Sequence, residues 1–350
     1  MPIKSTILTY PLLLILSTGK KSCTNIGRLI KKGSHWVASI LQPAEKSFDV
    51  LHKLCQSIFS EKKKLYLIID DTLIKKIFAL NMQGTGMFYD TKIGRSINAF
   101  RLVIAMISDG RNAIPITCSY LFSKELVDLC TEKFTSKEEI VKSFVDLAYK
   151  LFPSAEIVTV ADGLYASVKF LKWSIENKKP AEVRMRSNCV VTRNGVKNKL
   201  SELINHPCLR LTGRRTARTF SAVWHDLSLE ITMVKRIDKH GVESIVFQAA
   251  TYKAEPRQHV KAYKIRWNVE KHIRTGKQYL GLGDCFSTSL EIQYNHTAAV
   301  LLAYAIAQIE MKKQRLKKVE DSIRALKEKF NTSGFYRFVC GANFFSNFDA

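Results

Sequence analysis

Four residues in the last third of the chain have types and spacings that could perform phosphoryl chemistry. Tyr263, Arg266, Glu270 and Lys277 form the pattern Y-x2-R-x3-E-x6-K. If this segment is one α-helix, each residue advances about 100° around the axis, and the four side chains fall within roughly 60° of arc. One carboxylate then shares a helix face with two cations. This favours a metal-assisted phosphoryl-transfer site, because the acid can hold a metal ion while the cations hold phosphates.

Further acids follow two apolar runs that are typical of buried strands. Residues 65–69 end at the pair Asp70 and Asp71, and residues 155–161 end at Asp162. In mostly parallel sheets, functional groups collect at the carboxyl ends of the strands, so these acids could meet the helical glutamate in space. Because adjacent strand residues point to opposite faces, only one acid of the pair can enter a shared site, and we expect the other to cap locally. Three carboxylates suit one or two Mg²⁺ ions.

Each of these signals also has a purely structural explanation. An Asp at a strand end is often a turn residue, and helical cations such as Arg266 and Lys277 are usually solvated. Tyr263 and Trp267 could simply be packing groups. The combination is more informative than its members, because the acids and the four-residue helical pattern occur in one chain.

The composition indicates a globular protein with a polyanionic partner. The 350 residues include 55 Lys and Arg against 31 Asp and Glu, a formal net charge of +24 with a pI near 9.7. Nucleic acid is the commonest partner of such a basic chain, because each neutralised phosphate releases counterions. The eight cysteines form no C-x2-C motif, which argues against a structural zinc site and favours reduced thiols.

Hydrophobic periodicity predicts a mixed α/β fold. Asp109 to Asn112 is a good hairpin turn, and Ser136 with Glu139 is a capping box. The order of three strands, helix, strand, helix, strand, inserted segment and helix is typical of a ribonuclease-H-like mixed sheet with helices on both faces. The predicted strands are 65–69, 99–108, 113–122, 155–161 and 181–185, and the predicted helices are 25–41, 47–59, 136–152, 164–176, the segment around 263–277, 297–309 and 311–330.

We expect three regions along the chain. Residues 1–60 form an α-helical N-terminal region, residues 61–310 form the catalytic domain, and residues 311–350 form a C-terminal helix and tail. The basic, strand-like stretch of about 186–250, with Arg214, Arg215 and Arg218, is expected to be a β-rich insertion. The apolar run 7–16 resembles a short signal-peptide core, but Lys20 and Lys21 follow where a cleavage site should lie, so we expect a buried helix.

These motifs together resemble the DDE transposases of bacterial insertion sequences. The resemblance rests on the acid pair before Thr72, on Asp162-Gly163, and on the full Y-R-E-K pattern, and it covers about residues 60–310. More narrowly, the chain is similar to the Y-R-E-K signature group, whose members cut and paste through hairpin-ended intermediates. Some members carry a Trp in the insertion for hairpin formation, and neither Trp224 nor Phe247 matches that position.

The resemblance implies a function for each site residue. Asp71, which directly precedes Thr72, Asp162 and Glu270 would be the catalytic carboxylates and would bind Mg²⁺ or Mn²⁺. Tyr263, Arg266 and Lys277 would contact DNA phosphates. The reaction would be phosphodiester hydrolysis at the terminal inverted repeats of a mobile element, followed by strand transfer into target DNA.

The resemblance also implies partners and a location. We expect a homodimer assembled on DNA, no membrane association, and a cytoplasmic, nucleoid-associated protein. Two other functions fit the same residues: a ribonuclease-H-like nuclease that does not join strands, and a DNA-binding transposase relic without catalytic activity. A secreted basic protein would rest on the N-terminal apolar run alone.

Overall fold

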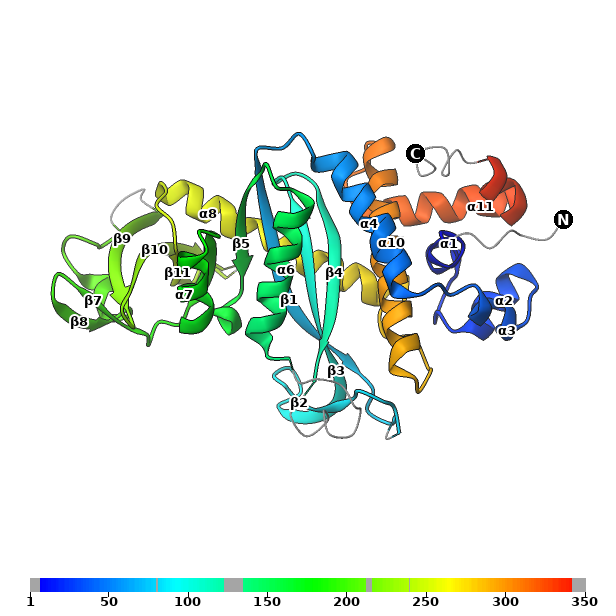
Figure 1. The fold of residues 1–350 in the computed structure, drawn as a ribbon, viewed down its shortest axis with the longest axis horizontal. Helices are drawn as coiled ribbons and strands as arrows, with labels where there is room; N and C mark the ends of the chain where they lie inside the picture. The colour runs from blue at the N-terminus through cyan, green and yellow to red at the C-terminus, as the bar shows by residue number, and fades with distance from the viewer. Residues whose placement is uncertain (1–6, 80, 123–134, 212–215, 239, 342–350) are drawn as a thin grey trace.

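The structure is a computed structural model in which residues 7–79, 81–122, 135–211, 216–238 and 240–341 are described, the last ten of these as helix backbone only. Arg214, Arg215 and the predicted tail beyond residue 341 lie outside the described residues. The described residues form a mixed α/β protein built on one sheet of eleven strands. Figure 1 shows this sheet flanked by helices, with a wholly helical part at the end formed by the N- and C-terminal helices.

The centre of the sheet brings the predicted acidic strands side by side. Strand β1 (Lys64–Lys75) is parallel to β5 (Glu156–Ala161), and β5 is parallel to β6 (Ala181–Met185). The hairpin of β3 (Arg95–Ser108) and β4 (Ala113–Leu121) pairs antiparallel with β1 through β3, as the turn at residues 109–112 predicts. The core is continuous across these strands, and residues 67–69 of β1 are fully buried.

Two features of this part of the sheet differ from the prediction. The stretch predicted as a loop contains a further strand, β2 (Gly86–Asp90), which shares the outer edge of β3 with β4. Strand β1 does not end at Ile69, because β3 pairs with it as far as Lys75. Its pairing with β5 does end at Ile69, opposite Ala161. The acid pair therefore lies where the parallel pairing stops, inside a longer strand.

The segment predicted as a β-rich insertion extends the same sheet. It contains β7 (Val190–Arg193), β8 (Val196–Lys199), β9 (Ala217–Trp224), β10 (Leu227–Ile237) and β11 (Glu243–Ala250). Strand β11 pairs antiparallel with β6, so the order is β2-β3-β1-β5-β6-β11-β10-β9-β7-β8, with β4 paired beside β2 on β3. The aromatic residues considered for hairpin formation, Trp224 and Phe247, are buried in this part of the core.

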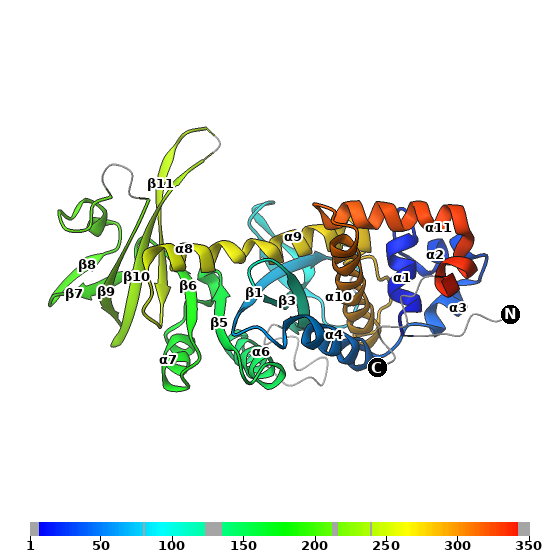
Figure 2. The same ribbon diagram turned by 90° about the horizontal axis from the view of Figure 1, so that it is seen from above.

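Helices cover the two faces of the sheet unequally. Figure 2 shows α4 (Ala44–Phe59), α6 (Lys137–Leu151) and α7 (Val168–Glu176) on one side, and α8 (Pro256–Ile265) and α9 (Trp267–Thr275) in line on the other. The predicted capping box of Ser136 and Glu139 begins α6. Helix α7 begins later than predicted, because a short 3₁₀ turn (Gly163–Tyr165) follows Asp162.

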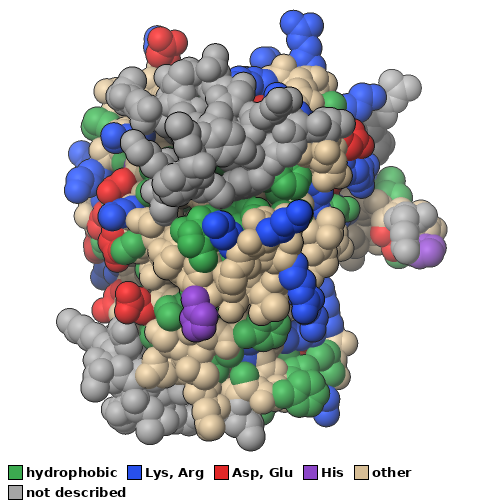
Figure 3. Space-filling model, turned by 90° about the vertical axis from the view of Figure 1, so that its right-hand side faces the viewer, with side chains coloured by type: hydrophobic (Ala, Val, Ile, Leu, Met, Phe, Trp, Pro, Cys, Tyr) green, Lys and Arg blue, Asp and Glu red, His purple; other side chains and the backbone are tan. Residues whose placement is uncertain are grey.

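The N- and C-terminal helices form one helical end. The apolar run folds as the buried helix α1 (Thr9–Leu16), and the predicted helix of residues 25–41 is two helices, α2 (Cys23–Ile30) and α3 (Ser34–Ser39). Helices α1 and α4 pack on α10 (Leu290–Lys313), which joins α11 (Val319–Gly341), both longer than predicted. Figure 3 shows Lys and Arg side chains among apolar ones on this end.

No helix in the described ranges is long and apolar enough to span a membrane. The division into regions at residues 60 and 310 stays a prediction.

A buried histidine packs helix α9 against α10. His272 is fully buried, its ring meets the edge of the Tyr304 ring at 4.3 Å between centroids, and neither ring nitrogen has a hydrogen-bond partner among the described residues. Burial lowers the pKa of His272 to about 3. Because the unfolded chain still binds a proton near pH 6.5, this group costs stability as the pH falls from 6.5 toward 3.

Replacing His272 with Leu is therefore expected to preserve the free energy of unfolding at pH 7.5 and to raise it relative to wild type at pH 5. The Leu removes the unpaired imidazole nitrogens and the protonation of the unfolded state together. Urea unfolding at both pH values measures this, with exposed His35→Leu as the matched control. The same pH dependence in wild type and His272→Leu would contradict this account of the buried imidazole.

Candidate active site

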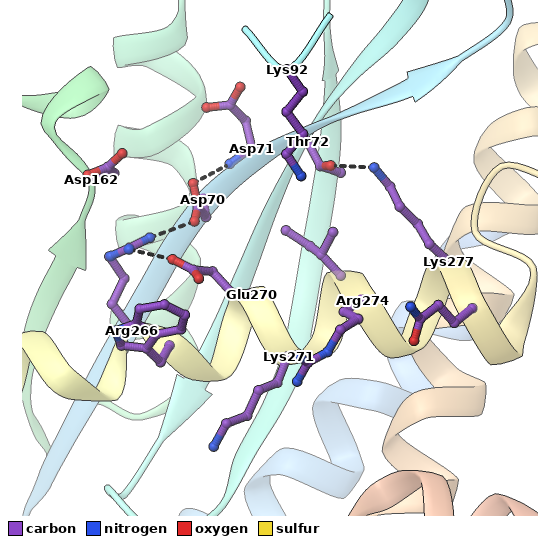
Figure 4. Close-up of a pocket in the computed structure, with 13 residues that line it drawn as sticks. Asp70, Asp71, Thr72, Lys92, Asp162, Arg266, Glu270, Lys271, Arg274 and Lys277 are labelled. Carbon is purple, nitrogen blue, oxygen red and sulfur yellow. Dashed lines mark hydrogen bonds and ion pairs between the residues drawn. The ribbon is translucent and has the colours of Figure 1, made fainter. Parts of the chain in front are cut away.

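A cavity of about 730 Å³ lies between residues 70–72 of β1 and helix α9. Charged side chains line the cavity on the side of the sheet and on the side of the helix, and Figure 4 shows how they converge on it. Its lining includes the acids Asp70, Asp71, Asp162 and Glu270, the cations Lys92, Arg266, Lys271, Arg274 and Lys277, and the half-exposed ring of Trp267.

The four-residue pattern spans three consecutive helical segments instead of one helix. Helix α8 ends at Ile265, Arg266 lies at the junction with helical dihedral angles, and α9 is followed by a π-helical turn (Gly276–Leu280) that contains Lys277. The side chains nevertheless reach the same strand ends. Tyr263 contacts Asp162, Arg266 contacts Asp70, and Lys277 contacts Thr72.

Arg266 forms ion pairs with two of the acids that line the cavity. Its Nη1 donates to Asp70 Oδ2 at 2.7 Å, and its Nη2 donates to Glu270 Oε1 at 2.5 Å. The guanidinium is largely buried, with 10% of its side chain exposed, and it also stacks over the Tyr263 ring at 5.4 Å. Two carboxylates from a strand and a helix are thus joined by one cation, a geometry that holds α9 against β1.

Asp70 has the most unusual environment of the acids. Burial raises its pKa to about 7, against the lowering influence of Arg266, and the neighbouring Asp71 and Asp162 raise it further. The sequence predicts that the second acid of the pair only caps the chain locally. Asp70 makes such a local contact, but it also makes a long-range one. Its Oδ1 does accept the backbone N–H of Asp71 at 2.9 Å, but its other oxygen binds Arg266, 196 residues away in sequence.

Asp71 points to the opposite face of β1, as strand alternation requires. Its carboxylate is bound by Arg101 Nε at 3.1 Å and by Lys137 Nζ at 3.8 Å, and it accepts the Tyr165 hydroxyl proton at 3.1 Å. Only 6% of its side chain is exposed. Because Tyr165 follows Asp162 by three residues, Asp71 faces the Asp162 turn, while Asp70 faces Glu270.

Asp162 is placed by the close approach of β5 and β6. The Tyr263 hydroxyl donates to its Oδ1 at 3.3 Å. At the next residue, Gly163, a Cβ atom would lie 3.2 Å from the Arg184 carbonyl oxygen, so a glycine lets the strand end turn against β6. Burial raises the pKa of Tyr263 to about 12, so its hydroxyl keeps its proton and remains a donor.

Lys277 fixes the far end of the pattern. Its Nζ donates to Thr72 Oγ1 and to the Leu73 carbonyl oxygen, both at 2.8 Å. Desolvation and the nearby cations Lys92 and Lys75 lower its pKa to about 8. With a pKa of about 8, the lysine remains mainly charged at neutral pH.

The carboxylates line the cavity, but they do not converge on one point. No group of three or more His, Cys, Asp or Glu side chains is arranged to hold a metal ion in the part of the chain that the structure describes. Basic partners hold the acids apart, since Arg266 takes Asp70 and Glu270 while Arg101 and Lys137 take Asp71. The type of donor nevertheless fits Mg²⁺, which takes carboxylate oxygens as ligands.

Sequence reasoning missed several side chains at this cavity. Lys271 and Arg274 follow Glu270 by one and four residues, so helical spacing alone could have indicated them. Lys92, Arg101 and Lys137 come from separate elements, and no pattern in the sequence marks them. The acids and the helical pattern can therefore be recognised from local sequence, whereas most of the cations around the acids are brought there by tertiary folding.

Comparison with known proteins gives one match that bears on this cavity. Residues 135–306 match the family described as Transposase DDE domain. The matched range includes Asp162, Glu270 and the whole Y-R-E-K pattern, and it begins after Asp71. No curated protein matches the chain. Over this range, the chain is therefore similar to the DDE domain of transposases.

Proposed function

We propose that the protein is a metal-dependent DNA transposase that hydrolyses a phosphodiester at each end of a mobile element and transfers the freed 3′-hydroxyl into target DNA. One observation carries this proposal: Asp162, Glu270 and the Asp70–Asp71 pair, supplied by two strands and a helix, line one cavity beside Arg266 and Lys277. Support also comes from the sheet, where β4-β3-β1-β5-β6 has the parallel and antiparallel relations expected of a ribonuclease-H-like domain.

We assign the three catalytic carboxylates to Asp71, Asp162 and Glu270. They would hold Mg²⁺ or Mn²⁺, which when bound supplies the Lewis acidity that lowers the pKa of water and polarises a phosphate. Asp71 is preferred to Asp70 because it directly precedes Thr72 and because Asp70, with its pKa near 7, is partly neutral at physiological pH. A neutral carboxyl group is the poorer ligand for a hard cation.

The cations of the helical pattern would bind the DNA backbone. Arg266 offers a planar guanidinium suited to two phosphate oxygens, and Lys277 offers a point charge on the other side of Glu270. Tyr263 donates through its hydroxyl and orients Asp162. Together these side chains would offset the charge that develops on the phosphate during in-line displacement.

The substrate would be the terminal inverted repeats of an insertion sequence, with target DNA as the second partner. Since two ends must be processed together, we infer a homodimer that assembles on DNA, in the cytoplasm and at the nucleoid. Membership in the Y-R-E-K group is part of the proposal and rests on the spacing of Tyr263, Arg266, Glu270 and Lys277. A nuclease without strand transfer and a catalytically inactive DNA-binding relic remain the alternatives to test.

The proposal is tested with purified full-length protein, Mg²⁺ and labelled duplexes carrying the inverted repeats that flank the gene. We expect cleavage at the repeat ends, loss of cleavage with EDTA, and no cleavage by Glu270→Gln. Joined products with a target plasmid separate transposition from nuclease activity. Binding by both proteins without cleavage by either would establish the relic instead.

A further inference from the structure

A second cavity continues the first one along α9 toward the C-terminal helices. It has a volume of about 670 Å³ and shares Lys271, Arg274 and Gln278 with the first. Beyond them, its wall includes further residues of α9 and of the π-helical turn. The rest comes from the β3–β4 turn, from α10, from the connection between α10 and α11, and from the start of α11. Its further charged residues are Arg111, Lys317, Lys318, Glu320, Asp321 and Arg324.

Most cations along this path have no side-chain partner among the described residues. Lys271, Arg274, Lys317 and Lys318 are exposed, and none of their side chains makes a hydrogen bond or ion pair with the described residues. The second cavity has two acids: Asp321 pairs with Arg324 at 2.8 Å, and Glu320 accepts from the neutral hydroxyl of Thr275 at 2.7 Å. Six cations against these two acids leave the lining of the second cavity with a net positive charge.

These cations follow one another along the side of the molecule that carries α9 and α11. Figure 2 shows α9 and α11 along the same side of the molecule, opposite α4, α6 and α7. In Figure 4, Lys271 and Arg274 point away from the carboxylates that Arg266 binds. From Trp267 to Leu280 the helical line has fourteen residues, which is about 21 Å or the length of roughly six base pairs.

We propose that the two cavities form one track for the phosphate backbone of duplex DNA, leading from the carboxylates along α9 to the start of α11. The inference rests on the proposed function and extends it, because it assigns DNA contacts to Lys271, Arg274, Lys317 and Lys318, which lie outside the four-residue pattern. The start of α11 adds the positive end of a helix dipole at the far end of the track.

The salt dependence of DNA binding tests the track. The full-length triple variant Lys271→Ala, Lys317→Ala, Lys318→Ala is compared with wild type in EDTA, using a 30-base-pair duplex that ends in the terminal repeat. Each phosphate contact contributes about −0.9 to the slope of log K against log salt. We expect the slope of the triple variant to be smaller in magnitude by roughly 2 to 3, and its footprint to shorten on one side of the cleaved bond.

The matched control changes three exposed lysines on the opposite face of the sheet, Lys53→Ala, Lys150→Ala and Lys169→Ala on α4, α6 and α7. This control should keep most of the wild-type slope and the full footprint. If the track variant and the control lose the same slope while wild type still cleaves repeat ends, the track is wrong and the proposed function stands. If wild type shows no salt-sensitive binding to the duplex, both fail.

Discussion

Asp71→Asn is expected to reduce Mg²⁺-dependent DNA cleavage by about 10³-fold or more, because it removes one of the three proposed catalytic carboxylates, which would act as a unit. The fold should persist, since Asn is isosteric with Asp and can still accept the Tyr165 hydroxyl proton. Cleavage rates of end-labelled repeat DNA measure the effect. Circular dichroism and the wild-type affinity for DNA in EDTA would show that the loss is chemical and not structural.

Asp70→Asn is the matched comparison, because the two acids are neighbours on β1 and line the same cavity. Asp70 binds Arg266 and takes no metal in the proposed assignment, so its replacement should cost only about 10- to 100-fold, the range of a positioning group. The reverse order of effects, with Asp70→Asn inactive and Asp71→Asn active, would move the first catalytic carboxylate to the acid that faces Glu270.

Arg266→Met is expected to have the largest effect on stability at this cavity. The substitution leaves the carboxylate of Asp70, which is 14% exposed, without its cation, and breaking a buried pair in this way costs about 3–5 kcal/mol of unfolding free energy. The loss should be greatest above pH 7 and smaller at pH 5. Protonation of Asp70, whose pKa is already raised to about 7, removes the unpaired charge as the pH falls.

A double-mutant cycle separates this pairing from general disruption of α9. The variant Arg266→Met with Asp70→Asn removes both charges and should recover most of the stability that Arg266→Met loses. Urea unfolding at pH 8 gives the four free energies. Additive losses in the double variant would mean that Arg266 stabilises the protein through its contact with Glu270 or through packing on Tyr263, and not through Asp70.

Much of the fold was predictable because its signals are local. The turn at residues 109–112 fixed a hairpin, and Ser136 with Glu139 fixed the start of α6. The strand β2 was missed because it is short, lies at the sheet edge and follows glycines, which normally indicate a loop. The extent of β1 was missed because the pairing of residues 70–75 depends on β3, which the sequence of β1 does not reveal.

The acids of the candidate site and its helical pattern could be predicted from the sequence, but the side chains that bind each acid could not. Strand alternation predicts that Asp70 and Asp71 face opposite sides, yet both sides of β1 are covered, so the sequence could not assign a side to each acid. The interruption at Arg266 has no Gly or Pro to mark it. The cations Arg101 and Lys137 reach Asp71 only through tertiary packing.

The most direct test of the central claim, that these carboxylates act with a divalent metal on a DNA phosphodiester, uses sulphur in place of one non-bridging oxygen at the cleaved phosphate. Mg²⁺ prefers oxygen, whereas Mn²⁺ tolerates sulphur better. For one of the two stereoisomers, we predict that cleavage by wild type is lost in Mg²⁺ and restored in Mn²⁺, and that Glu270→Gln cleaves in neither. Equal cleavage of the oxygen and sulphur substrates in Mg²⁺, or cleavage of either in EDTA, would contradict the account.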